Sequence, residues 1–193
     1  MIDKKIILAS SSDRRKELLN RLKIQYTSMP SKIDESKFEH EIPEKMVQDL
    51  SLAKGSKVAE IVEEALIISA DTIVVCEDKI LGKPEDEDDA FEMLQLLQNN
   101  KHSVYTGLAL ISADDNMHYL DYDITEVFMR KIDKEEIERY IKTGEPMDKA
   151  GSYAIQGKGG IFVEKIIGSY FTVMGLPIHK LSVALKSFSL EII

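Results

Sequence analysis

The chain has 193 residues, of which 44% are hydrophobic and 31% charged, as in ordinary globular proteins. This length suits one domain, or two small lobes that share a core. The formal net charge of -9 disfavours broad binding to nucleic acid, because a phosphate backbone requires an excess of cations. No stretch approaches the apolar length of a membrane span, so no membrane partner is expected. An acidic protein that binds an anionic small molecule must therefore gather its cations locally.

The single cysteine, Cys76, excludes an internal disulfide and fits a reducing, cytoplasmic environment. Its place in an apolar run favours packing over chemistry. The apolar run at the N-terminus, residues 6–9, is too short for a signal peptide. The histidines share no metal-ligand spacing, so a zinc site is not expected. They are His40, His102, His118 and His179.

The first element in chain order is a short strand over residues 5–9, followed by the start of a helix over 13–23. Ser10 and the two serines after it are residue types that begin helices. Arg14 and Arg15 fall in the first helical turn, where the helix macrodipole disfavours cations. Beside free backbone N–H groups and serine hydroxyls, two arginines form a good seat for phosphate. The alternative is that both side chains point to solvent.

A second strand is expected over residues 24–29, and a polar loop follows over 31–41. This loop contains two adjacent acids, Asp34 and Glu35. A pair of loop acids is usually solvated, yet the same pairing is also how proteins gather hard cations. Both interpretations stay open at this point.

The next helix begins at Pro43, in the first-turn position that proline favours, and is expected to reach about residue 64. Ile61 is among the apolar residues expected to face the core. Lys54 lies next to this apolar stripe. Gly55 costs a mid-helix position about 1 kcal/mol relative to alanine, so close packing or ligand approach is expected there.

In the middle of the chain, a buried strand over residues 66–70 ends on Asp71 and Thr72, and a second apolar run follows. A carboxylate at the tip of a buried strand is costly unless a metal, a cation or a substrate proton uses its charge. Lys83 lies on a loop defined by Gly and Pro that could return an ammonium to the same place. The alternative is a plain turn and a solvated lysine.

The second half of the chain predicts a hairpin between helices. The expected elements are a helix over 85–98, strands over 104–111 and 117–130, and helices over 133–143 and 176–188. Five of the ten glycines lie in the glycine-rich segment, residues 148–170, which suits either close approach to a ligand or plain turns. The pattern predicts an α/β fold with a mixed twisted sheet, flanked by helices, and a site in a cleft at strand ends.

Six segments carry a family resemblance in a consistent order. They are ASSSDRRKELL (9–19), ADTIV (70–74), LGKP (81–84), VYTGLAL (104–110), PMDKAGSYAIQGKGGIFV (146–163) and GSYFTVMGLP (168–177). Together they resemble the Maf family of nucleoside triphosphate pyrophosphatases. The resemblance runs from the first strand to the last helix, and it implies one domain of this type over residues 1–193.

This resemblance implies two lobes around a deep nucleotide cleft, and it allows a homodimer. It implies cleavage of a nucleoside triphosphate to the monophosphate and pyrophosphate, as in the house-cleaning of nucleotide pools. The implied catalytic residue is Asp71. The implied phosphate-binding residues are Ser10, Arg14, Arg15, Lys54 and Lys83. The implied metal ligands are Asp71 and Glu35, with Mg²⁺ or Mn²⁺ as the cofactor, since only oxygen ligands are on offer.

Substrate selection follows from the branch of the family that the chain resembles. That branch acts on dTTP and UTP, and its selecting residues fall on Arg14, Thr72 and Gln156. The chain departs from the family at Asp13, where a proline is usual, and a carboxylate there could weaken triphosphate binding or recruit metal. Three rival readings stay open: a nucleotide-binding regulator of cell division, a purine pyrophosphatase of the inosine-triphosphatase type, and an acidic interaction protein whose glycines only form turns.

Overall fold

The computed structural model describes residues 5–38, 40–115 and 117–193. Its strands are β1 Lys5–Leu8, β2 Thr27–Ser28, β3 Ala65–Cys76, β4 Lys79–Leu81, β5 Lys101–Ser112, β6 His118–Met129 and β7 Val163–Ile167. Its α-helices are α1 Asp13–Arg21, α2 Pro43–Ala59, α3 Glu87–Leu97, α4 Lys134–Ile141, α5 Tyr170–Met174 and α6 Ile178–Ser187. Short 3-10 helices lie at η1 Glu35–Phe38, η2 Glu145–Asp148, η3 Ala150–Ser152 and η4 Lys158–Phe162.

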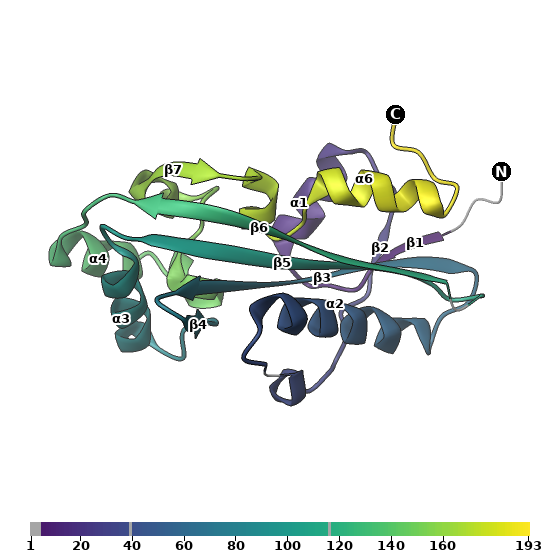
Figure 1. Ribbon diagram of the computed structural model, residues 1–193, viewed down its shortest axis with the longest axis horizontal. Coiled ribbons are helices and arrows are strands. Elements are labelled where there is room, and N and C mark those ends of the chain that lie inside the picture. Colours follow the sequence, from purple (N-terminus) through teal and green to yellow (C-terminus); the bar gives the residue numbers. More distant parts are fainter. Residues whose placement is uncertain (1–4, 39, 116) are drawn as a thin grey trace. The chain divides into compact units, whose positions relative to one another are not determined.

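The strands form one mixed sheet in the order β2-β1-β3-β5-β6-β7, with β4 paired to β3 (Figure 1). Strand β1 runs parallel to both β2 and β3, whereas β4 is antiparallel to β3 and β7 is antiparallel to β6. The expected mixed sheet flanked by helices is therefore confirmed.

The expected hairpin of β5 and β6 is also confirmed. The N–H of Ser112 donates to the carbonyl of Met117 at 2.9 Å, and the N–H of Met129 donates to the carbonyl of Asn100 at 3.0 Å. These two pairs keep one antiparallel register from the tight connection to the far ends of both strands.

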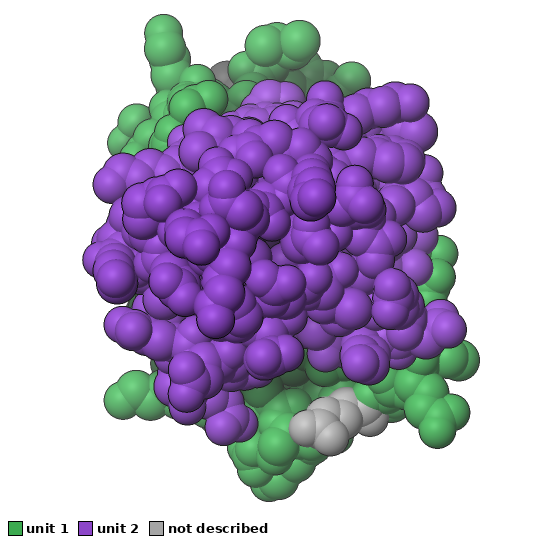
Figure 2. Space-filling view, turned by 90° about the vertical axis from the view of Figure 1, so that its left-hand side faces the viewer, with its two compact units in different colours: residues 1–71, 106–123, 175–193 green, residues 72–105, 124–174 purple. Residues whose placement is uncertain are grey.

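The chain divides into two compact units (Figure 2). Unit 1 comprises residues 1–71, 106–123 and 175–193, and unit 2 comprises residues 72–105 and 124–174. The boundaries fall inside β3, β5 and β6, so each of these long strands contributes one part to each unit.

In unit 1, α2 covers one face of the sheet, and α1 and α6 cover the other (Figure 1). Apolar residues of β1 and β3, such as Ile7 and Ile67, are fully buried, and Val58 of α2 packs with them. A Cβ at Gly107 of β5 would lie 2.0 Å from the carbonyl oxygen of Val47 in α2. Strand and helix backbones therefore approach closely at a position that only glycine can occupy.

Unit 2 has its own core, which joins the ends of the long strands to α3 and α4. Cys76 is 1% exposed within it, and burial raises the pKa of its thiol, so its expected packing role is confirmed. Helix α4 begins where the sequence predicted. The Asp133 carboxylate accepts from the N–H of Glu136, and the Glu136 side chain returns a bond to the N–H of Asp133, which forms a capping box.

Three expected boundaries were wrong. The strand expected over 24–29 is paired only at Thr27–Ser28, where it meets the end of β1. The helix expected to reach residue 64 ends at Ala59, so Ile61 lies beyond it and is 69% exposed. Asp71 does not end a strand, because β3 continues from Ala65 to Cys76 through it.

The continuity of β3 has a physical reason in its pairing. Its first part pairs with β1 as far as Ile68, and its last part pairs with β4 from Val74. Asp71 therefore lies on an extended backbone between the part of β3 that pairs with β1 and the part that pairs with β4.

No α-helix in the described part of the chain combines the length and apolar character needed to cross a bilayer.

Candidate functional site

The carboxylate of Asp71 is held by Lys54, which α2 carries to the face of β3. The Lys54 Nζ donates to Asp71 Oδ1 at 2.5 Å, and the two side chains are only 13% and 11% exposed. A buried carboxylate needs such a partner, because burial without compensation costs several kcal/mol. The pair places an acid and an ammonium, 17 residues apart in sequence, at one point of unit 1.

Glu35 joins the same point from the 3-10 helix η1. Its Oε1 lies 2.9 Å from Lys54 Nζ, and its side chain is 59% exposed. One ammonium thus serves two carboxylates, one buried and one open to solvent. Of the two loop acids, Glu35 therefore shares the partner of Asp71. Asp34 instead contacts its neighbours Ser36 and Lys37.

Arg15 is fixed at the start of α1 by two hydrogen bonds. Its Nε donates to the carbonyl of Gly175 at 2.8 Å, and its NH1 donates to Ser10 Oγ at 3.2 Å. Ser10 is 8% exposed, and its Oγ also accepts from the N–H of Ser12 at 3.2 Å. Ser12 makes no side-chain cap for α1, so its hydroxyl does not satisfy the first-turn N–H groups. The guanidinium thus lies beside a helix N-terminus, as the sequence predicted.

Electrostatics connect Arg15 with the acidic residues. Burial lowers the pKa of Arg15 to about 10, the Asp71 carboxylate opposes this shift, Arg14 adds to it, and Glu35 opposes it weakly. Arg15 remains a cation at neutral pH. The Asp71 and Glu35 carboxylates thus lie near enough to Arg15 for their charges to offset part of the effect of burial.

The side chains around Lys54 fit a divalent cation of the Mg²⁺ type. Asp71 and Glu35 already point their oxygens at one positive centre, and Mg²⁺ in phosphate enzymes is commonly held by one or two carboxylates together with substrate oxygens. Among the described residues, no group of three or more His, Cys, Asp or Glu is arranged to hold a metal. A metal here would therefore draw its further ligands from water or phosphate.

Asp13 is the position at which the chain departs from the family pattern. Its side chain is 96% exposed and accepts from Lys16 Nζ at 2.9 Å. An acid at the first position of a helix also suits the macrodipole. Asp13 thus serves the helix start.

The remaining predicted residues belong to unit 2. Thr72 follows Asp71 on β3 and is half-buried. Lys83 lies on the exposed loop after β4. Gln156 lies in a turn of the glycine-rich segment, and its Oε1 is buried without a hydrogen-bond partner among the described residues. A buried acceptor without a donor is unusual, and it suggests that a ligand supplies the donor.

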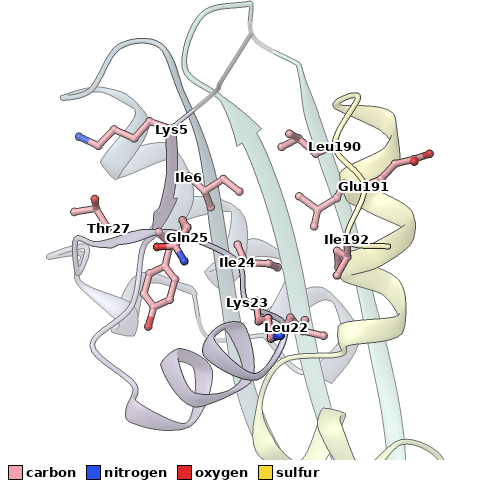
Figure 3. Close-up of a pocket in the computed structure, with 12 residues that line it drawn as sticks. Lys5, Ile6, Leu22, Lys23, Ile24, Gln25, Thr27, Leu190, Glu191 and Ile192 are labelled. Carbon is pink, nitrogen blue, oxygen red and sulfur yellow. The ribbon is translucent and has the colours of Figure 1, made fainter. Parts of the chain in front are cut away.

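A cavity of about 580 Å³ in unit 1 is not this site. Residues of β1, β2 and the C-terminal segment line it, and Figure 3 shows Ile6 and Ile24 on one side with Leu190 and Ile192 on the other. None of the predicted site residues lines this cavity.

Sequence reasoning missed two parts of the site. The Gly175 carbonyl that orients Arg15 lies 160 residues away in sequence. Its signal was the segment GSYFTVMGLP, and Gly175 has a φ of 99°, which favours glycine. The second missed part is Tyr140 with Glu145, which hold the loop that contains Gln156. Glu145 comes one residue before the quoted segment PMDKAGSYAIQGKGGIFV.

Comparison with known proteins gives a consistent result. A family model described as Maf-like protein matches residues 5–188. A dTTP/UTP pyrophosphatase of Thermoanaerobacter sp. (strain X514) is 50% identical over 183 residues, covering 94% of this chain and 95% of that protein. A dTTP/UTP pyrophosphatase of Clostridium botulinum (strain Eklund 17B / Type B) is 51% identical over 185 residues, covering 94% and 98%.

Solved structures show a more distant likeness. A HAM1 protein from Coxiella burnetii superposes with a TM-score of 0.51 at 13% identity, covering 95% of this chain and 98% of that chain. At this identity the likeness concerns the fold alone.

Proposed function

Because the chain belongs to the family of Maf-like proteins, we propose that it is a nucleoside triphosphate pyrophosphatase that hydrolyses dTTP and UTP to the monophosphate and pyrophosphate. Relatives that are 47–51% identical along nearly the whole chain carry the name dTTP/UTP pyrophosphatase. The observation that carries the proposal is the buried pair of Asp71 and Lys54, which places a carboxylate close enough to Arg15 to act on its pKa. The single free cysteine supports a cytoplasmic location.

In the proposed hydrolysis, Asp71 positions the attacking water and accepts its proton. Lys54 holds the carboxylate in place through their hydrogen bond. A divalent cation, when bound by Asp71 and Glu35, supplies charge neutralisation for the phosphate oxygens.

Arg15 and Ser10 hold the phosphates. The planar guanidinium of Arg15, oriented by its bonds to Gly175 and Ser10, suits bidentate contact with phosphate. Arg14 adds a second cation in the same helical turn. Lys83, on the exposed loop after β4, is proposed as a further phosphate-binding cation. The pyrophosphate leaving group gains negative charge as the bond breaks, so these cations stabilise it.

Gln156 is proposed to select the base, together with Arg14 and Thr72. The buried Gln156 Oε1 lacks a donor among the described residues, and the N3–H of uracil or thymine is a donor of the required kind. The amide nitrogen of the same side chain can donate to a carbonyl oxygen of the base. A site built on paired hydrogen bonds rejects a base that leaves its polar groups unsatisfied.

The test is a product analysis with competing substrates. The purified protein is given dTTP, UTP, CTP and 7-methyl-GTP together, with Mg²⁺ or with Mn²⁺, and the products are separated. We expect pyrophosphate and the monophosphates of thymidine and uridine to accumulate first. Orthophosphate with diphosphates, or preferential loss of 7-methyl-GTP, would contradict the proposal.

A further inference from the structure

The loop that carries Gln156 is tied down on both of its sides by one hydrogen-bonded pair, Tyr140 and Glu145. We define the Gln156 loop as residues 154–159. Its turn is closed by the N–H of Gly157, which donates to the carbonyl of Ala154 at 3.1 Å. Gln156 is a central residue of this turn, so its direction depends on how the flanking backbone is held.

The side of the loop before the turn is held by a tyrosine of α4. The N–H of Ala154 donates to Tyr140 Oη at 3.1 Å, and the Tyr140 hydroxyl donates in turn to Glu145 Oε1 at 2.8 Å. Tyr140 is 5% exposed, and its ring packs edge-on against Phe162 at a centroid distance of 5.1 Å. Burial and packing therefore hold the Tyr140 side chain independently of its hydrogen bond to the loop.

The side of the loop after the turn is held by the carboxylate itself. Glu145 Oε2 accepts from the N–H of Lys158 at 3.1 Å, and Oε1 accepts from the N–H of Gly159 at 3.0 Å. A Cβ at Gly157 would lie 2.4 Å from Glu145 Oε2, so glycine leaves the space that the carboxylate occupies. Two consecutive amides that could have received a phosphate are thus bonded to an internal anion.

Electrostatics support a charged Glu145. Burial alone would raise the pKa of Glu145, but the N–H groups of Gly159 and Lys158, the Tyr140 hydroxyl and the Lys149 ammonium lower it overall. Hydrogen bonds to an ionised acceptor are about twice as strong as those between neutral groups. The loop is therefore held more firmly than by an ordinary turn.

We propose that Tyr140 and Glu145 are positioning residues for base selection, holding residues 154–159 in the conformation from which Gln156 reads the pyrimidine. Neither residue needs to touch the substrate in this role. The buried and unpartnered Oε1 of Gln156 agrees with this assignment, because an acceptor held away from other donors requires a rigid loop. This inference rests on the proposed function, since it concerns selection among nucleoside triphosphates.

The first test measures the loop without any nucleotide. Tyr140→Phe keeps the ring and removes the hydroxyl, so amide hydrogen exchange at Ala154 should accelerate in the apoprotein. Glu145→Gln should accelerate exchange at Lys158 and Gly159. Tyr119→Phe is the matched control, because its hydroxyl donates to a carboxylate of Asp121 at 2.9 Å instead. Unchanged exchange in both test variants would overturn the proposal.

The second test measures selection. The ratio of kcat/KM for dTTP to that for CTP should fall at least about threefold in Tyr140→Phe, a coupling-sized effect, and should stay at the wild-type value in Tyr119→Phe. In a Gln156→Ala background the same Tyr140→Phe change should leave the ratio unaltered, because the hydroxyl acts through Gln156. Equal losses for both nucleotides, or an undiminished effect in the Gln156→Ala background, would show a purely structural role and overturn the proposal.

The two tests separate this inference from the proposed function. A wild-type protein that cleaves neither dTTP nor UTP would refute the function before any variant is compared. The exchange experiment needs no substrate, so it still decides whether Tyr140 and Glu145 hold the Gln156 loop.

Discussion

At the scale of single residues, the ammonium of Lys54 joins two acids. It donates to the buried Asp71 at 2.5 Å and forms an ion pair with the exposed Glu35 at 2.9 Å. Two carboxylates around one ammonium leave a net negative charge, and this favours capture of a further cation. The same arrangement fixes the position of the Asp71 carboxylate.

Asp71→Asn tests the proposed role of Asp71 as the proton acceptor. The amide keeps the shape of the side chain but loses the charge and the base, so kcat should fall by about 100-fold or more. Nucleotide affinity, measured by calorimetry, should largely persist because the phosphate-binding cations remain. Asp34→Asn, a carboxylate that bonds to Ser36 rather than to Lys54, serves as the control and should keep full turnover. Near wild-type turnover in Asp71→Asn would assign the base to Glu35.

Lys83→Ala tests the phosphate contact proposed for this lysine. Lys83 is exposed on the loop after β4, so its removal should leave the unfolding midpoint unchanged. The value of kcat/KM for dTTP should fall at least tenfold, since a charged contact to phosphate is worth about 1.5–3 kcal/mol. Lys79→Ala, in the same hairpin and also exposed, is the control. A Lys83→Ala protein with unchanged kcat/KM would remove Lys83 from the site.

His102 makes stability depend on pH. Its Nε2 lies 2.8 Å from the Tyr153 hydroxyl, and burial lowers the pKa of this histidine from 6.5 to about 4. The unfolded chain therefore binds a proton between pH 6.5 and 4 that the folded chain does not bind. Stability from this residue is complete above pH 6.5 and decreases as pH falls to 4. His102→Gln should flatten the pH dependence of the unfolding free energy in this window, measured by urea denaturation; an equally steep decline would contradict this account.

At the scale of elements, close packing of β5 on α2 depends on one glycine. A Cβ at Gly107 would lie 2.0 Å from the carbonyl oxygen of Val47, a backbone atom that cannot rotate away. Gly107→Ala should therefore destabilise unit 1 by about 1–3 kcal/mol or more, the cost typical of overpacking. The midpoint of denaturant unfolding measures this loss. Gly82→Ala is the control, since nothing lies within 4 Å of its added Cβ.

Local chemistry allowed most elements to be predicted from the sequence. The helix after Asp133 was predicted because its cap lies within four residues, and the β5–β6 hairpin because its strands are adjacent in the chain. The course of β3 through Asp71 was not predictable in this way. A polar pair between apolar runs is typical of a turn, but pairing with β5, and with β1 and then β4, keeps the backbone of β3 extended.

The same distinction between local and long-range signals applies to the residues of the site. Asp71, Lys54 and Arg15 could be named through the family resemblance, and the structure joins them within unit 1. The contact of Arg15 with Gly175 could not be predicted, since a carbonyl carries no side-chain signal and the partners are 160 residues apart. The brace of Tyr140 and Glu145 was also missed, because backbone N–H groups of a glycine-rich loop give no indication of their acceptor.

At the scale of the whole molecule, a chain with a net negative charge has to bind a negatively charged triphosphate. The sequence has 34 acidic and 25 basic side chains, so the average field repels a triphosphate. The cations of α1 and α2 offset this repulsion only locally, and Lys54 is already shared by two carboxylates. A divalent cation would supply the missing positive charge.

Metal dependence is therefore the last prediction. A chelator should abolish pyrophosphate release, and either Mg²⁺ or Mn²⁺ should restore it. Glu35→Gln removes one of the two carboxylates that face Lys54, so the Mn²⁺ concentration for half-maximal binding should rise about tenfold, the size of effect expected from a removed ligand contact of about 1.4 kcal/mol. Electron paramagnetic resonance of Mn²⁺ titrated into the nucleotide-free protein measures binding without turnover.

The matched control is Glu60→Gln. Glu60 forms a 2.7 Å ion pair with Lys57 on α2, an exposed pair of the same chemical type, so its loss should leave Mn²⁺ affinity unchanged. Equal weakening in both variants would mean that the metal responds to net charge rather than to Glu35. Full activity in the chelator would mean that the arginines and lysines neutralise the substrate charge without a metal. In that case Arg15→Lys should lower kcat/KM most. The substitution keeps the charge but loses the planar guanidinium that contacts Ser10 and Gly175.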